Sequence, residues 1–322
     1  MRMSALLVVM TLLSDRAPAS VRNLECITVS GSPYVRLSDW GQSAGCAMKW
    51  NKKDGLAELS CSSAHLLFTA DSRRAEISGV PVWLSLPVVN RNGTPLISLT
   101  DLQTAIEPVL SPRKSSARLE TVCLDPGHGG KDTGKADGRQ FEKKYTLLLA
   151  NETAALLRER GLKVVLTRTT DATVELAERP LLASRQGADL FVSLHYNAAE
   201  MPVHGVEVFC LAPAGMSSSD AGGGKSSQAA EPGNAQNERN FLLAYELQKS
   251  IGRSLPLENL GVKRSHFEVL RLARIPAVLV EGGFMSNPSD ARTIYDSAFR
   301  KRMARAIVDG ILAYQNAILV NQ

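Results

Sequence analysis

Two histidines in this sequence follow apolar segments in surroundings that suit a metal site. His128 comes after the segment Thr121–Asp125 and stands between Gly127 and Gly129. Flanking glycines free the backbone, so the imidazole can be presented in an open crevice. His195 ends a second apolar segment. Ligands of open α/β sheets bind beyond the carboxyl ends of the strands, so we expect both imidazoles at one edge of a sheet.

Two carboxylates are expected at the same edge. Glu142 opens a predicted helix 142 − 128 = 14 positions after His128, and the short connection can fold it back toward the histidines. Taken alone, Glu142 could equally complement the dipole of its helix. Glu281 follows the apolar segment Pro276–Val280, at the expected end of that strand. Two histidines and one glutamate form a common catalytic zinc set with a fourth position for water, and Glu281 could serve beside it as a base.

Alternating strands and helices must position these side chains. Their alternation predicts an α/β domain with a mostly parallel sheet and helices on both faces. The predicted strands are Thr121–Asp125, Leu162–Thr167, Asp189–His195, Gly205–Leu211 and Pro276–Val280, and the predicted helices are Phe141–Arg160, Val174–Gln186 and Pro288–Ala317, the last broken near Ser297.

A small β-rich domain is predicted ahead of this unit, over residues 25–110. Its short alternating segments are separated by turn residues at Asn51–Gly55 and Asn90–Gly93. Cys46 and Cys61 flank the first turn almost symmetrically, so a disulfide is expected if the strand register suits it. Helical pattern is brief there, at Ser38–Ala44 and Thr100–Val109.

Three other segments have distinct compositions. Residues 111–118 are polar and contain a proline, which predicts a linker to the domain at 119–318. Residues 213–237 are rich in Ser, Gly, Ala and Asn, which predicts a mobile surface loop. Residues 1–19 combine a basic start, a short apolar run and Ala17-Pro18-Ala19, which predicts a secretory signal peptide cleaved after Ala19. The alternative for this last segment is an ordinary buried N-terminal element.

The overall composition is that of a globular protein. The 322 residues are 44% apolar and 21% charged, which excludes a disordered chain, a collagen-like repeat and a coiled coil. Five cysteines are too few for a disulfide scaffold. The net charge of +5 (37 − 32) comes without a basic stripe of interleaved aromatics, so no nucleic-acid partner is expected. The sequence has no second long apolar stretch, so no transmembrane span is predicted.

Five motifs in fixed order resemble the zinc-dependent N-acetylmuramoyl-L-alanine amidases, which are peptidoglycan hydrolases. The match covers about residues 119–318. The motifs are Leu124–Gly130, Phe141–Lys143, Leu166–Arg168, Ser193–Ala198 and Leu279–Asn287, with Gly261–Lys263 and Phe267–Arg271 also fitting the pattern.

The resemblance implies a zinc amidase (phosphorylase/hydrolase-like) fold with one zinc ion bound by His128, Glu142 and His195. It makes Glu281 the catalytic carboxylate that takes a proton from water and delivers it to the departing amine. The bond cut would join N-acetylmuramic acid to L-alanine of the stem peptide. Peptidoglycan is then the expected partner, and an activator protein is a further candidate. With the signal peptide, this places the protein in the periplasm or cell envelope, or outside the cell.

Two alternatives to the amidase remain open. A zinc peptidase or carboxypeptidase acting on wall peptides can use the same ligand types, and a non-catalytic wall-binding protein could carry a structural metal. A structural zinc normally has four protein ligands, and three are convincing here, which favours catalysis. The β-rich domain more loosely resembles the N-terminal-like domain of copper amine oxidases in Tyr34–Leu37, Gly45–Trp50 and Pro95–Leu99. That likeness implies wall attachment or a structural role, and no copper.

Overall fold

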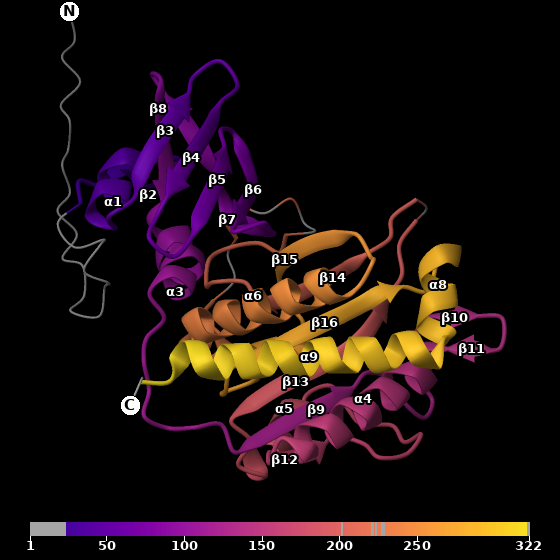
Figure 1. Cartoon of the computed structure of the whole chain (residues 1–322). Coiled ribbons are helices and arrows are strands. Elements are labelled where there is room, and N and C mark those ends of the chain that lie inside the picture. Colours follow the sequence, from indigo (N-terminus) through magenta and orange to yellow (C-terminus); the bar gives the residue numbers. More distant parts are fainter. Residues whose placement is uncertain (1–23, 201, 220–221, 223, 227–228, 321–322) are drawn as a thin grey trace, which may run out of the picture.

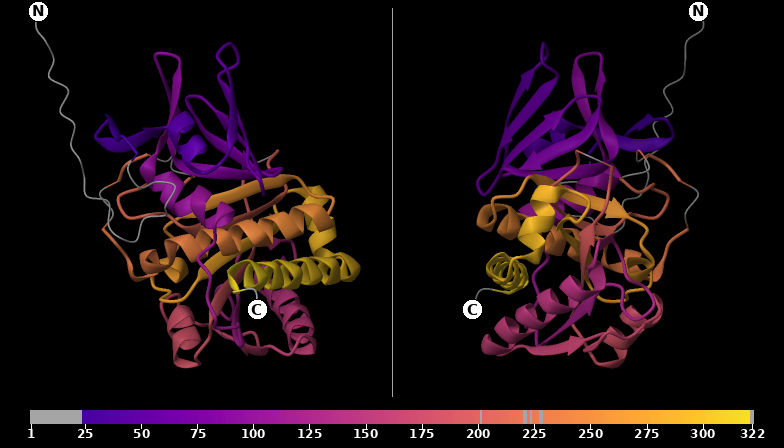
Figure 2. Two further views of the ribbon diagram at one scale, coloured as in Figure 1. Left: turned by 60° about the vertical axis from the view of Figure 1, so that its left-hand side comes forward. Right: turned by 90° about the vertical axis from the view of Figure 1, so that its right-hand side faces the viewer.

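The computed structural model describes residues 24–200, 202–219, 222, 224–226 and 229–320. The predicted signal peptide, residues 1–19, lies outside them. Figure 1 shows a β-rich domain, drawn in indigo and purple, stacked on a larger α/β unit, and Figure 2 shows the same stacking from two other sides.

The sheet of the α/β unit is mostly parallel, as predicted. Its strand order is β12-β9-β13-β16-β14-β15. The first four strands run parallel, β14 is antiparallel to β16, and β15 is parallel to β14. The strand bounds are Lys163–Leu166 (β12), Thr121–Pro126 (β9), Leu190–Asn197 (β13), Ala277–Phe284 (β16), Val206–Leu211 (β14) and Asn259–Ser265 (β15).

Helices cover both faces of this sheet. Successive strand residues point to opposite faces, and Val192 and Phe191 of β13 accordingly join two different apolar clusters. The cluster of Val192 includes residues of α4, α6 and α9, and that of Phe191 includes residues of α5 and α7. The predicted two-sided cover is therefore confirmed. The helices are α4 (Glu142–Glu159), α5 (Glu178–Arg185), α6 (Asn237–Ser254), α7 (Glu268–Arg271), α8 (Pro288–Tyr295) and α9 (Ser297–Ile318).

Several element boundaries differ from the predicted ones. The helix predicted from Val174 begins at Glu178, because the carbonyl of Val174 accepts hydrogen bonds from the buried Arg179. The expected break near Ser297 is confirmed: the Asp296 side chain accepts from the amide of Ala298 and caps α9. The strand predicted as Pro276–Val280 continues to Phe284.

The β-rich domain is an antiparallel meander with short helices. Both predicted hairpins are present, as β3–β4 and β7–β8. The strands are β1 (Ile27–Val29), β2 (Ser32–Arg36), β3 (Ala47–Asn51), β4 (Leu56–Ser60), β5 (His65–Thr69), β6 (Ser72–Ile77), β7 (Val80–Arg91) and β8 (Thr94–Ser98), and the helical segments are α1 (Leu37–Ser43), α2 (Leu99–Asp101), the π-helical η2 (Leu102–Ile106) and α3 (Glu107–Leu110).

The expected disulfide between Cys46 and Cys61 is confirmed. In the β3–β4 ladder Ala47 lies opposite Ser60, so the two cysteines occupy the next facing positions. Their Cα atoms are 4.2 Å apart. The symmetric flanking of the turn thus translates directly into the register that a disulfide needs.

The β-rich domain is joined directly to the α/β sheet. Val82 of β7 pairs in parallel with Val262 of β15, which makes one continuous sheet. The indole of Trp83 donates to the carbonyl of Leu260 at 3.2 Å, next to this pairing. Gly261 has φ +89°, and a Cβ there would lie 2.4 Å from the carbonyl oxygen of Pro81. A glycine is needed at this contact because only its backbone fits.

The segment predicted as a linker is also anchored. The amide of Ser115 donates to the carbonyl of Ile318 at 2.7 Å, and the amide of Val320 donates to Ser115 at 3.2 Å. The Lys114 ammonium donates to the carbonyl of Ala317. Residues 111–118 therefore connect to the end of α9 and not only to their chain neighbours.

Several described residues of the segment 213–237, which was predicted to be a mobile, exposed loop, contact other parts of the protein. Met216 is buried against Tyr34 and Leu86 of the β-rich domain. The amide of Gly224 donates to Ser85, and that of Ser219 donates to Arg264. The composition of the segment could not reveal these contacts, because their partners lie far away in the sequence. Over the described part of the chain, no helix combines the length and the apolar character needed to cross a bilayer.

Candidate metal centre

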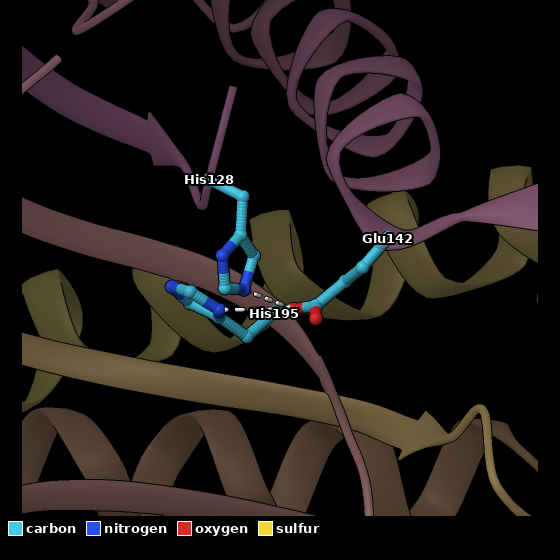
Figure 3. Close-up of side chains that lie close together, drawn as sticks. All are labelled: His128, Glu142 and His195. Atoms are coloured by element: carbon cyan, nitrogen blue, oxygen red, sulfur yellow. Dashed lines mark hydrogen bonds and ion pairs between the residues drawn. The ribbon is translucent and has the colours of Figure 1, made fainter. Parts of the chain in front are cut away.

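His128, Glu142 and His195 come together as predicted. Their potential ligand atoms all lie within 4.8 Å of one another. Oε1 of Glu142 is 3.0 Å from Nε2 of His128 and 3.0 Å from Nδ1 of His195 (Figure 3). Two imidazole nitrogens and one carboxylate oxygen converging on one point are a donor set that suits zinc.

The backbone around His128 and two glycines leave room for the three side chains to meet. His128 lies just after β9 with φ +61°, a left-handed conformation that is uncommon outside glycine. A Cβ at Gly127 would lie 2.2 Å from Cε1 of His195, and one at Gly134 would lie 2.5 Å from Oε2 of Glu142. Glycines at these two positions leave the space that the three side chains occupy.

Two buried arginines hold the loop that carries His128. Arg179 donates to the carbonyls of Pro126 and His128, each at 3.0 Å, and pairs with Asp125 at 2.8 Å. Arg168 donates to the carbonyl of Pro126 at 3.0 Å and to that of Gly127 at 2.8 Å. Carbonyls that a strand or helix would normally satisfy are thus satisfied by two guanidinium groups.

Charge around the centre favours the anionic form of Glu142 and the protonated form of His128. Burial raises the pKa of the Glu142 carboxyl, but hydrogen bonds and charges from His128 and His195 outweigh it and hold that pKa well below its usual range. Burial lowers the pKa of His128, but Glu142 and Asp132 outweigh it, so the pKa of His128 is raised. The negative charge of Glu142 thus lies between two imidazole nitrogens. A metal cation bound by all three side chains fits this arrangement.

Asp132 orients the first histidine. Its Oδ2 lies 2.7 Å from Nδ1 of His128, which leaves Nε2 to face Glu142. Carboxylates in this position fix the ring and tautomer of metal-binding histidines. Arg168 ends one of the five motifs, but no role was predicted for it, and neither Asp132 nor Arg179 was predicted as a site residue. The available signal for Asp132 was its position four residues after His128 in a glycine-rich turn.

Glu281 lies beside the centre, but inside a strand and not after one as predicted. It is 8% exposed and sits opposite His195 in the parallel β13–β16 pairing. Residues in register on neighbouring strands point to the same face, so Glu281 and His195 share one. Both line a cleft of about 490 Å³, together with His128, Glu142, Phe267 and the first residues of α7.

Other candidate side chains lie elsewhere. The ring of His266 donates through Nε2 to the carbonyl of Met216 at 2.7 Å, and His266 is not among the described residues that line the cleft. Cys123 and Cys210 are fully buried core residues within strands β9 and β14. Burial raises the pKa of both thiols, which keeps them protonated and unreactive.

The chain matches a family of known proteins over this unit. Residues 122–313 match the family model described as N-acetylmuramoyl-L-alanine amidase. The N-acetylmuramoyl-L-alanine amidase AmiA of Salmonella typhimurium is 36% identical over 226 residues, an alignment that covers 62% of this chain and 78% of AmiA.

Solved structures match the same unit. The amidase AmiC2 of Nostoc punctiforme superposes with a TM-score of 0.52 at 32% identity, covering 63% of this chain and 99% of that one. The CwlD amidase of Clostridioides difficile, solved in complex with the GerS lipoprotein, gives a TM-score of 0.52 at 25% identity, covering 61% of this chain and 98% of CwlD. The matched family residues begin after the β-rich domain.

Proposed function

The chain belongs to the N-acetylmuramoyl-L-alanine amidase family, and from this premise we propose that it cleaves its amide with one zinc ion held by His128, Glu142 and His195. The substrate is peptidoglycan, and the bond is the one between N-acetylmuramic acid and L-alanine of the stem peptide. The observation that carries the proposal is the convergence of the three donor atoms within 4.8 Å in a cleft.

Glu281 is the general base and acid in this proposal. Zinc in such a site acts as a Lewis acid toward water and the scissile carbonyl. Glu281 lines the same cleft on the strand beside His195, where its carboxylate takes the proton of the attacking water. It then delivers this proton to the nitrogen of L-alanine as the amide bond breaks.

Asp132, Arg168 and Arg179 act through His128. Asp132 holds its ring by Nδ1, and the two arginines hold the carbonyls on either side of it. Three protein ligands leave a coordination position open for water and substrate, which distinguishes a catalytic zinc site from a structural one.

The proposed place of action is outside the cytoplasm, in the periplasm or cell envelope or beyond it. It rests on the signal-like sequence of residues 1–19 and on the location of peptidoglycan. An exported protein whose first residue is Ser20 is the expected form, and only unprocessed protein beginning at Met1 would contradict it. Activation by a partner protein is a further proposal, supported by the structure of CwlD with GerS.

Product analysis tests the function directly. Purified peptidoglycan is incubated with the purified protein, and the products are identified by mass spectrometry. We expect free peptides with a new N-terminal alanine and intact glycan chains. Peptides shortened at their carboxyl ends would instead indicate a carboxypeptidase, and tight binding without any cleavage would indicate a wall-binding protein.

A further inference from the structure

The cleft beside the metal centre is lined by more acidic than basic side chains. Asp132, Glu142, Glu268 and Glu281 line it. Among its described lining residues, the lysines and arginines are Lys135 and Arg179. Arg179 is 3% exposed and is engaged by Asp125 and by backbone carbonyls. Apart from the proposed zinc ion, Lys135 is therefore the cation among the described lining residues that an anionic group entering this cleft can pair with.

Lys135 is fixed next to the centre by its backbone. Its amide donates to Oε2 of Glu142 at 2.9 Å, and its carbonyl accepts from the amide of Glu142 at 2.9 Å. The next residues form the short β10–β11 hairpin, Ala136–Asp137 with Gln140–Phe141, which returns the chain to α4 (Figure 1). The position of the Lys135 Cα is thus set by the same glutamate that faces both histidines.

The side chain of Lys135 is available for a ligand. The residue is exposed, and its ammonium makes no ion pair with a described residue. Its four-carbon stem is flexible and ends in a compact charge with three donors. By contrast, Lys143 on the first turn of α4 is already paired with Asp171 at 2.7 Å.

Distances along the substrate match this position. One residue, L-alanine, separates the scissile carbonyl from the second residue of the stem peptide, and each extended residue spans about 3.5 Å. A carboxylate on the second residue therefore lies about 7 Å from the scissile carbonyl. With the carbonyl at the donor triad, this falls within reach of a lysine whose amide touches Glu142.

We propose that Lys135 binds a carboxylate on the residue after L-alanine and makes this amidase favour stem peptides in which that group is ionised over those in which it is a carboxamide. The inference rests on the proposed function, since it assigns one side of the same substrate. The geometry gives it physical grounds: Lys135 is the cation of the cleft that no described side chain neutralises.

Two soluble muramoyl peptides test the inference. They are identical except that the residue after L-alanine is D-isoglutamate in one and D-isoglutamine in the other. We expect the zinc-loaded full chain to show a five- to tenfold higher kcat/KM for the isoglutamate peptide, about the size of one partly exposed ion pair. Lys135→Met should remove the preference by slowing only that peptide, and Lys135→Arg should retain it.

Lys131→Met is the matched control, because it removes one positive charge from the same turn at a residue that is not among the described lining residues. It should leave the preference unchanged. Equal use of both peptides by the unmodified chain, or a preference that survives Lys135→Met, overturns the inference. A preference lost equally in Lys131→Met also overturns it, because the effect would then come from net charge.

A binding measurement separates failure of this inference from failure of the proposed function. Calorimetric Kd values for the two peptides are compared in Glu281→Gln and in Glu281→Gln with Lys135→Met. A preference for isoglutamate that depends on Lys135 supports the inference, even if the unmodified chain hydrolyses neither peptide and the proposed function fails. Equal Kd values in Glu281→Gln overturn it.

Discussion

One carboxylate oxygen of Glu142 faces ring nitrogens of both His128 and His195 at 3.0 Å. This makes the glutamate the centre of the donor set, while Asp132 and the two arginines determine where the first ring stands. Glu281, opposite His195 in the sheet, belongs to the cleft and not to this set. Single substitutions should therefore separate metal binding from proton transfer.

Replacing His128 or His195 by Ala should lower zinc content and activity together, because a ligand is lost. Glu281→Gln keeps the size of the side chain and removes its ability to accept a proton, so zinc content and folding should persist. The rate should fall by about 10²–10⁴-fold, the usual contribution of a positioned base. Metal analysis beside the hydrolysis rate checks this. Zinc lost from Glu281→Gln would mean that Glu281 is a fourth ligand, and an unchanged rate would remove it from the mechanism.

Arg179→Met should destabilise the protein by about 3–5 kcal/mol, because it leaves the buried Asp125 without its cationic partner. It also leaves the carbonyl of His128 without that donor, so zinc affinity should fall. Arg185→Met is the matched control on the same helix, where the arginine pairs at the surface with Glu178. That change should cost less than about 1 kcal/mol. Denaturant unfolding measures both, and equal losses would contradict the role given to Arg179.

At the scale of elements, the strands with continuous apolar runs were the easiest to predict. β9 and β13 are buried on both faces, and each accordingly contains a continuous run of apolar residues. The helix α6 was not predicted, because buried polar residues such as Asn240 and Gln248 interrupt its apolar pattern. These two amides bond to backbone in the tertiary structure: Asn240 accepts from Ala277, and Gln248 donates to Val206.

Removing the disulfide by Cys46→Ser with Cys61→Ser should destabilise the β-rich domain by about 3 kcal/mol, because the bond closes a loop with a sequence separation of 15. Amidase activity should persist below the unfolding temperature, since the metal centre lies in the other unit. Thermal unfolding and hydrolysis assays check the two parts. Cys26→Ser, which removes a free thiol of the same domain, is the control and should change neither.

Two buried tyrosines predict a loss of stability at high pH. Burial, with added charge from Asp101, raises the pKa of Tyr34 to about 12, and burial with Glu246 does the same for Tyr245. A raised folded-state pKa gives stability that is complete below pH 10 and is lost as the pH rises from about 10 to about 12. Unfolding midpoints at pH 8 and pH 11 measure this loss. The double variant Tyr34→Phe with Tyr245→Phe should lose less between the two pH values, and an equal loss would contradict the assignment.

At the scale of the whole molecule, the β-rich domain is built into the sheet of the catalytic unit. Trp83 donates to Leu260, Arg264 donates to Thr104, and the Tyr245 hydroxyl donates to Ile77. Such contacts favour the structural role that the sequence left open beside wall attachment. They also imply that the two units do not move as independent bodies on a flexible tether.

A chain shortened to begin at residue 119 should therefore unfold at a lower temperature than the full chain, by about 5 °C or more, a loss of about 2 kcal/mol. It would expose the edge of β15, where Val262 pairs with Val82 in the intact chain. Unpaired sheet edges promote association, so the shortened chain should also self-associate. Calorimetry and sedimentation at several concentrations test both effects. An unchanged unfolding midpoint and a monomer at all concentrations would show that the β-rich domain does not stabilise the catalytic unit.

The sequence by itself predicted the mostly parallel sheet, the convergence of His128, Glu142 and His195 with Glu281 beside them, and the facing positions of the two bonded cysteines, because each depends on local pattern or on strands of one sheet. Apolar periodicity sets the strands, and the edge rule of parallel sheets then gathers the residues at their ends. Only the tertiary structure decided which carbonyls Arg168 and Arg179 bind, the place of Lys135 at the cleft, the anchoring of the described residues within 213–237 and the union of the two units. These features depend on contacts between residues far apart in sequence. No local sequence pattern predicts which buried carbonyl an arginine will bind.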